Sequence, residues 1–280
     1  MLCQRSPIVP AQPAVADVGT GPPVLLLHGQ PGVGSDWDGV AGALMEDHRV
    51  LAPDRPGYGA GAAAAISLSG NVDALVGMLS EREVDPVVAV GHSYGGAVAI
   101  LLAARHPELV RGLVLAGSVG PADSLAAADR LLALPFVGGV LTAAGLYTFG
   151  RMLPRLRRQV VRAERPAMDW LVASLPDERY RSITVAQSRR LCCSVVEEQR
   201  ALLREIDDVD AAMSTVHVPT VVVTGTWDIV VPPSVAARLA AAVPGAELVT
   251  VSRTGHFLPR DQPALLADVI RRVEQRALTG

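Results

Sequence analysis

Short runs of apolar residues alternate along most of this chain with longer stretches of mixed apolar and polar residues. The short runs have the length and β-branched content of buried strands, and the longer stretches predict helices. Strands are predicted at Ala14–Val18, Val24–Leu27, Arg49–Ala52, Val87–Val90, Leu113–Ala116, Thr220–Thr224 and Glu247–Val251. Helices are predicted at Ser35–Glu46, Leu68–Arg82, Gly95–Arg105, Ser234–Ala242 and Pro263–Arg276. This alternation favours an α/β fold on a doubly wound, mostly parallel sheet, with Ala14–Val18 as an antiparallel edge strand.

The alternation stops between residues 118 and 218, where the pattern is helical and is interrupted by prolines. We interpret residues 118–218 as a helical cap inserted into an α/β core made of residues 1–117 and 219–280. Within the cap, Leu131–Phe149 carries no charge over 19 residues, which reaches the lower length of a membrane span. Pro135 and several glycines favour a buried or pocket-lining helical hairpin instead, so no membrane span is predicted.

The segment Gly91-His92-Ser93-Tyr94-Gly95-Gly96 lies between the predicted strand Val87–Val90 and an alanine-rich helix. A serine in a G-x-S-x-G pattern on a strand-to-helix turn is held in a strained backbone conformation, with its hydroxyl above the sheet. Glycines on either side leave room for the chain to reverse its direction. Because a serine hydroxyl is a poor nucleophile by itself, Ser93 requires a neighbouring base and a group that orients that base.

Residues that follow two later strands are candidates for this base and this acid. His256 comes just after the last predicted strand, and Asp228 comes after the strand Thr220–Thr224. The chain order Ser93, Asp228, His256 is that of an elbow hydrolase. We therefore predict Ser93 as the nucleophile, His256 as the general base and Asp228 as the acid that orients it. Considered alone, Asp228 is also typical of a turn or a helix cap.

Acyl transfer also needs donors for the oxyanion that forms on the substrate carbonyl. The backbone N–H of Tyr94 comes directly after the nucleophile, at the start of a helix whose dipole favours negative charge. The backbone N–H of Gln30 lies in the glycine-rich loop after an early strand. We predict these two amides as the oxyanion hole. The Gln30 side chain either reaches the substrate or is solvated.

Composition removes several other classes of function. Only 19% of the residues are charged and the net charge is −3, which gives no electrostatic reason to expect nucleic acid or an anionic membrane as a partner. All 25 basic residues are arginine, so no lysine is available for a Schiff base. The three cysteines form neither a disulfide framework nor a zinc spacing, and no signal peptide is evident. These features favour a reducing, cytoplasmic location.

Five motifs together resemble the α/β-hydrolase superfamily over nearly the whole chain outside the insertion. They are His28-Gly29-Gln30-Pro31-Gly32, Asp54-Arg55-Pro56-Gly57-Tyr58-Gly59, Gly91-His92-Ser93-Tyr94-Gly95-Gly96, the strand end at Asp228, and Gly255-His256. The resemblance implies an eight-stranded sheet with the helical cap inserted after the sixth strand and covering the serine. The Asp54–Gly59 loop is similar to that of epoxide hydrolases and haloalkane dehalogenases, but those enzymes have an aspartate nucleophile where this chain has Ser93.

The sequence predicts a serine hydrolase that cleaves a carboxylic ester of a small-to-medium apolar substrate through an acyl-enzyme, with no metal or organic cofactor. Trp37, Tyr147 and Trp227 are candidates for lining the substrate pocket, although such aromatic residues are more often plain core. A thioesterase, a carbon–carbon bond hydrolase and a cofactor-free perhydrolase would use the same triad. A ligand-sensing or catalytically silent member of the fold is the alternative that is not an enzyme. The oligomeric state is not predicted.

An arginine stripe in the cap bears on the possible partners. Arginines recur there at steps of three and four, which places them on one helix face. They are Arg151, Arg155, Arg158, Arg162 and Arg165. Such a stripe is usually a solvated face, and the alternative is docking of a carrier-bound or other acidic substrate.

Overall fold

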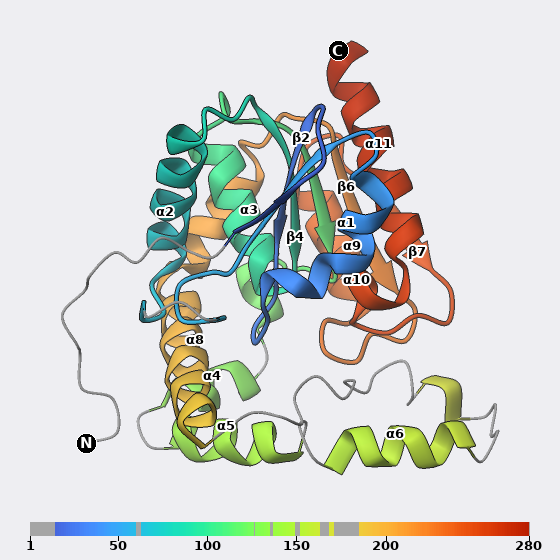
Figure 1. Ribbon diagram of the computed structural model, residues 1–280. Helices are drawn as coiled ribbons and strands as arrows, with labels where there is room; N and C mark the ends of the chain where they lie inside the picture. The colour runs from blue at the N-terminus through green and yellow to red at the C-terminus, as the bar shows by residue number, and fades with distance from the viewer. Residues whose placement is uncertain are drawn as a thin grey trace.

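The computed structural model describes residues 15–59, 63–125, 127–134, 137–148, 152–162, 168–170 and 185–279. Its centre is a seven-stranded sheet in the order β1-β3-β2-β4-β5-β6-β7 (Figure 1). The strands are β1 (Val15–Val18), β2 (Pro23–Leu27), β3 (Arg49–Pro53), β4 (Val87–His92), β5 (Val110–Ala116), β6 (Thr220–Gly225) and β7 (Glu247–Val251). Every neighbouring pair is parallel except β1 with β3, which is antiparallel. The α/β class, the mostly parallel sheet and the antiparallel edge strand are therefore confirmed.

The number of strands differs from the expectation. The described residues form seven strands, and each of them corresponds to an apolar run in the sequence. The eighth strand came only from the family resemblance and has no counterpart among them. The insertion accordingly follows the fifth strand, β5, rather than a sixth. One edge of the sheet is formed by the four-residue strand β1, which pairs only with β3.

Helices cover both faces of the sheet (Figure 1). One face carries α2 (Leu68–Glu81), α3 (Tyr94–Arg105) and α9 (Pro233–Ala242), whose buried side chains share a core with β2, β4 and β5. The other carries α1 (Asp38–Leu44) and α11 (Pro263–Thr279), which enclose a second core. Between the layers, β2, β4 and β6 are buried along their whole length. This explains why they appear in the sequence as continuous apolar runs.

The cap lies beyond the carboxyl ends of the parallel strands (Figure 1). Its described helices are α4 (Ala127–Ala133), α5 (Val137–Tyr147), α6 (Leu153–Arg162) and the first part of α8 (Val185–Met213). The last part of α8 belongs to the core cluster, where Leu202, Ile206, Val209 and Met213 pack with α2 and α3. One continuous helix thus joins the cap to the core.

The uncharged segment Leu131–Phe149 falls on α4 and α5, two short helices that both contact α8. No helix in the described parts of the chain is both long and apolar enough to cross a membrane. The segment is less buried than expected, because large side chains on these two helices and on the turn between them are exposed. They are Leu131, Leu134, Val137, Val140 and Leu141.

The predicted arginine stripe lies only partly within the described residues. Arg155, Arg158 and Arg162 lie on α6, whereas Arg151 and Arg165, the ends of the arginine stripe, fall outside the described residues.

The two adjacent cysteines differ in their bonding. Cys192 is a free thiol, but Cys193 is disulfide-bonded. A disulfide does not agree with the reducing compartment that the cysteine content predicted, because disulfides persist mainly in oxidising compartments.

A tight turn between β4 and α3 holds Ser93. Ser93 has φ 53° and ψ −121°, a positive-φ conformation that a residue with a side chain rarely adopts. A Cβ on Gly91 would lie 2.5 Å from the Gly95 carbonyl oxygen, and one on Gly95 would lie 2.4 Å from that of Leu27. Both contacts are with backbone, so α3 approaches β2 and β4 this closely only because these positions are glycine.

Replacing Ile206 by alanine should lower the free energy of unfolding by about 2–4 kcal/mol, because Ile206 is buried where α8 meets the core. Leu131→Ala, at an exposed position on α4, should change it by less than about 0.5 kcal/mol. Urea unfolding followed by circular dichroism measures both. Equal effects would mean that α8 is not anchored in the core as described.

Gly91→Ala should destabilise the protein by about 3 kcal/mol, because the added methyl group collides with the backbone of Gly95 and Gly96. The matched control is Gly77→Ala on α2, where a Cβ meets no atom within 4 Å. That variant should keep or raise stability by up to about 1 kcal/mol. Thermal unfolding of the pair tests the elbow geometry, and a Gly91→Ala protein as stable as the control would refute it.

Candidate active site

The elbow places Ser93 at the carboxyl end of β4 and at the N-terminus of α3. Its backbone is tied to the neighbouring strand, because the Ser93 amide donates to the Ala116 carbonyl at 3.1 Å. The Ser93 carbonyl accepts from Gly96 at 2.9 Å and from Val119 at 3.3 Å. Ser93 remains partly exposed, while the α3 residues that follow it are buried. A rigid backbone thus presents an accessible hydroxyl.

Asp228 and His256 meet at the same edge of the sheet, on the loops that follow β6 and β7. His256 Nδ1 donates to Asp228 Oδ2 at 2.8 Å, and both side chains are buried. The other carboxylate oxygen, Oδ1, accepts from the amides of Val230 and Val231 at 2.9 and 2.8 Å. Asp228 therefore both closes its own turn and fixes the proton of His256 on Nδ1, which leaves Nε2 free to act as a base.

Two neighbours hold the His256 loop in place. The His92 ring packs on the His256 ring with centroids 4.8 Å apart, and His92 Nε2 donates to the His256 carbonyl at 2.9 Å. Gly117, directly after β5, leaves the room that the pair needs, since a Cβ there would lie 3.3 Å from both Asp228 Oδ2 and His256 Nδ1. Within the described residues the Ser93 hydroxyl makes no hydrogen bond to His256. Such contacts are often long in unliganded enzymes and tighten when substrate binds.

The two amides predicted for the oxyanion hole are available as donors. Neither the Gln30 N–H nor the Tyr94 N–H makes a hydrogen bond within the described part of the chain. The peptide that carries the Gln30 amide lies beside the nucleophile, because a Cβ on Gly29 would be 3.0 Å from Ser93 Cβ. The Gln30 side chain does not point to solvent: its Nε2 donates to the Val195 carbonyl on α8 at 3.0 Å.

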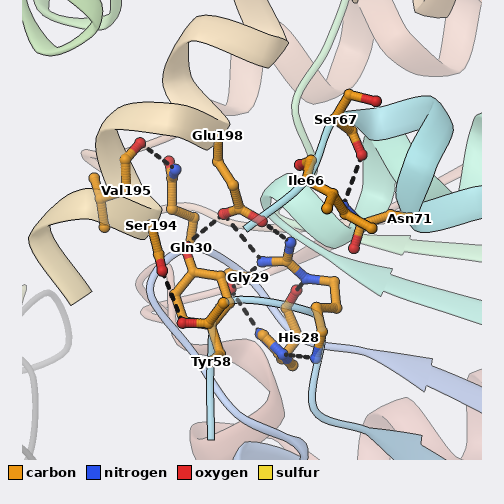
Figure 2. A network of polar contacts seen from close by, with 12 residues as sticks. His28, Gly29, Gln30, Tyr58, Ile66, Ser67, Asn71, Ser194, Val195 and Glu198 are labelled. Atoms are coloured by element: carbon orange, nitrogen blue, oxygen red, sulfur yellow. Dashed lines mark hydrogen bonds and ion pairs between the residues drawn. The ribbon is translucent and has the colours of Figure 1, made fainter. Parts of the chain in front are cut away.

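Behind this loop lies a buried polar network that the sequence did not predict (Figure 2). Arg55 forms a fully buried ion pair with Glu198 of α8. Arg55 Nε also donates to the His28 carbonyl at 3.0 Å, and Nη2 donates to the Gly29 carbonyl at 2.9 Å. The Tyr58 hydroxyl donates to Glu198 Oε2 at 2.5 Å. Arg55 lies in the Asp54–Gly59 motif, which predicted no role for it, and no local pattern marks Glu198 as its partner.

Burial keeps two of the histidines, His28 and His92, in the neutral form. Burial lowers the pKa of His92 to about 3, and the nearby His256 contributes in the same direction. Burial and then Arg55 hold the pKa of His28 well below its usual range. His28 Nδ1 faces the Gly29 carbonyl at 2.9 Å, while Nε2 accepts from the Arg55 amide at 2.9 Å. Its proton is therefore on Nδ1.

The carboxyl and phenol groups around Arg55 are shifted as well. Burial raises the pKa of Glu198, against the opposing effect of Arg55. Burial, reinforced by Glu198, also raises the pKa of the Tyr58 phenol well above its usual value. Tyr58 therefore stays protonated and keeps donating to the carboxylate.

The three aromatic residues predicted for the substrate pocket have different locations. Trp37 is completely buried in the core and packs edge-on against His92, so it supports the His92 ring rather than lining a cavity. The side chain of Tyr147 lies outside the described part of the structure. Trp227 does line a cavity of about 280 Å³, next to the loops that carry Asp228 and His256. The other lining residues are Arg157, Asp169, Arg253, Thr254, Arg260, Asp261 and Gln262.

Among the described residues, no group of three or more His, Cys, Asp or Glu side chains is arranged to hold a metal ion. The geometry brings together a serine hydroxyl on a positive-φ turn, an imidazole oriented by a carboxylate, and two amides without hydrogen-bond partners among the described residues. This combination suits attack on a carbonyl carbon.

Comparison with known proteins gives relatives of known and unknown activity. An uncharacterised protein of Mycobacterium tuberculosis is 29% identical over 267 residues, covering 91% of this chain and 75% of the relative. A 2-hydroxymuconate semialdehyde hydrolase of Pseudomonas sp. strain CF600 is 28% identical over 263 residues, covering 91% of this chain and 87% of that protein. Among solved structures, a thermophilic esterase from Thermogutta terrifontis superposes with a TM-score of 0.70 at 21% identity, covering 94% and 93% of the two chains.

The fold agrees with that of the solved esterase. The description of the matching family is Alpha/beta hydrolase family, and the match extends over residues 24–269, most of the chain. The protein is a member of the α/β-hydrolase family.

Proposed function

We propose that this α/β hydrolase is a serine esterase, which cleaves a carboxylic ester of a small-to-medium substrate through an acyl-enzyme. The observation that carries the proposal is the 2.8 Å hydrogen bond between Asp228 and His256 at the sheet edge where Ser93 stands on its positive-φ turn. A third group that orients the base distinguishes a catalytic serine from one that is merely exposed.

In the proposed mechanism His256 Nε2 takes the proton from Ser93 Oγ as this oxygen attacks the ester carbonyl. The oxyanion that forms accepts hydrogen bonds from the amides of Gln30 and Tyr94. Collapse breaks the bond to the leaving alcohol, which receives the proton from His256. A water molecule then attacks the acyl-enzyme by the same route and restores Ser93. Asp228 stabilises the imidazolium in both steps without taking its proton.

The expected substrate has an apolar acyl or alcohol part, in keeping with the uncharged cap segment Leu131–Phe149, which includes all of α5. The cavity next to Trp227 is polar, because its lining combines Arg157, Arg253 and Arg260 with Asp169 and Asp261. Arg253 pairs with Asp169 and Arg260 with Asp261, so the cavity suits a polar end of the molecule.

Docking of a carrier-bound acyl group through the arginine stripe is a separate proposal, which rests on the arginines that recur along α6.

Carbon–carbon bond hydrolysis is the second candidate, and the names of two relatives support it. Two relatives that each cover more than 85% of this chain are named 2-hydroxymuconate semialdehyde hydrolase and 2-hydroxy-6-oxo-2,4-heptadienoate hydrolase. Their names denote substrates that are themselves carboxylates.

Ser93→Ala should abolish labelling by a fluorophosphonate probe and lower ester hydrolysis by about 10⁴-fold or more. Asp228→Asn should lower kcat by about 10³- to 10⁴-fold, because the amide no longer fixes the proton on Nδ1 of His256. The matched control is Asp268→Asn, an exposed aspartate on α11, which should leave the rate unchanged. Persistent labelling of Ser93→Ala, or equal rates in the two asparagine variants, would contradict the triad.

A substrate panel separates the two candidates. Wild-type protein should hydrolyse neutral p-nitrophenyl esters of short and medium chain length with a higher kcat/KM than it shows for 2-hydroxymuconate semialdehyde. Both reactions are followed by absorbance. The reverse order, with loss of the second activity in Ser93→Ala, would overturn the esterase proposal in favour of carbon–carbon bond hydrolysis.

A further inference from the structure

The Gln30 amide belongs to the same peptide group as the Gly29 carbonyl. In a trans peptide the N–H and C=O point in opposite directions, so whatever holds the carbonyl also aims the amide. Two donors hold it: His28 Nδ1 and Arg55 Nη2, each 2.9 Å from the Gly29 oxygen. The peptide beside Ser93 is therefore held at its carbonyl oxygen by two buried side chains, His28 and Arg55.

Arg55 can hold this carbonyl only because it is itself held in place. Its guanidinium is inaccessible to water and forms its ion pair with the equally buried Glu198 on α8. The ring planes of Tyr58 and Tyr94 flank it, with the Arg55 Cζ 5.1 and 4.7 Å from the two ring centroids. A buried ion pair adds little stability compared with apolar side chains of similar volume. Its directional hydrogen bonds are the feature that an apolar replacement would lack.

Further contacts connect the same loops to α8. Gln30 Nε2 donates to the Val195 carbonyl at 3.0 Å, and Ser194 Oγ donates to the Gly57 carbonyl at 2.7 Å (Figure 2). Three contacts within little more than one helical turn, at Ser194, Val195 and Glu198, thus tie α8 to the loops after β2 and β3. The oxyanion-hole peptide is attached to the cap as well as to the core.

We propose that Arg55 and Glu198 are positioning residues of the oxyanion hole: Arg55 aims the Gln30 amide through the Gly29 carbonyl, and Glu198 of α8 fixes Arg55. The cap helix then sets the geometry of the hole. The positive charge on Arg55 also polarises the Gly29–Gln30 peptide, which makes the Gln30 N–H a stronger donor to the developing negative charge. This inference rests on the proposed acyl-transfer function of the site.

Two variants remove the ion pair in different ways. Glu198→Gln leaves the buried Arg55 guanidinium without its counter-ion, whereas the double variant Arg55→Met with Glu198→Leu removes both charges and leaves no buried charge to destabilise the fold. On a p-nitrophenyl ester both should lower kcat by about 10- to 100-fold with little change in KM, because the lost interaction acts on the transition state. Glu197→Gln is the matched control, since Glu197 pairs with Arg200 near the surface of the same helix.

Stability and catalysis should separate in the double variant. We expect its melting temperature to be closer to wild type than that of Glu198→Gln, while its kcat stays low. Affinity for a trifluoromethyl ketone, which forms an oxyanion with Ser93, should fall by the same factor as kcat. A double variant whose kcat recovers together with its melting temperature would show that the pair is structural only, and would overturn the proposal.

A direct readout does not depend on turnover. With glycine labelled at its carbonyl carbon, the Gly29 resonance should shift in the double variant and stay in place in Glu197→Gln. An unmoved Gly29 resonance refutes the anchoring even if the wild-type protein cleaves no ester in the panel. Loss of ester turnover and of fluorophosphonate labelling in the wild type would instead refute the proposed function.

Discussion

The close approach of α3 to β2 and β4 is the constraint on which the rest of the site depends. It is possible only because Gly91 and Gly95 have no Cβ, since a methyl group at either would lie about 2.5 Å from a backbone oxygen. This approach turns the chain so sharply that Ser93 takes a positive φ. The turn places the hydroxyl above the sheet, and it brings the first free amide of α3 to the same point. The positions of the Ser93 hydroxyl and of the Tyr94 amide therefore both follow from the same packing contact.

The second half of the site depends on hydrogen bonds rather than on packing. Asp228 uses one oxygen to close its own turn and the other to orient His256, so the loop after β6 and the base are fixed together. Arg55 has the corresponding role on the other side, where it joins the loop after β2 to α8. In both places a charged group has several partners, and a charge-assisted hydrogen bond defines an orientation more narrowly than an apolar contact does.

Sequence reasoning found the elements whose signals are local. The buried strands appear as apolar runs, so the sheet was predictable from the sequence. The order of short motifs at strand ends also predicted that Asp228 and His256 lie together, and the structure places them in hydrogen-bond contact. The role of Glu198 could not be predicted, because its partner Arg55 is 143 positions away in the sequence. Its charged neighbours Glu197 and Arg200 are also typical of a solvated helix. Trp37 was assigned to the pocket because an aromatic residue has the same signature in a core and in a binding site. The strand count was wrong because it came from the family and not from this chain.

The length of α8 explains how a cap can take part in the geometry of the oxyanion hole. Glu198 stands on the same continuous helix as Ile206, about 12 Å away along the axis, and Ile206 is packed in the core. A rigid helix therefore transmits the position of the core to the carboxylate that holds Arg55. The neighbouring helices α4 and α5 pack against α8, but none of their described residues belongs to the core clusters, and several of their apolar side chains are exposed. Under the proposed function, substitutions on α4 and α5 would therefore change substrate preference without moving Glu198.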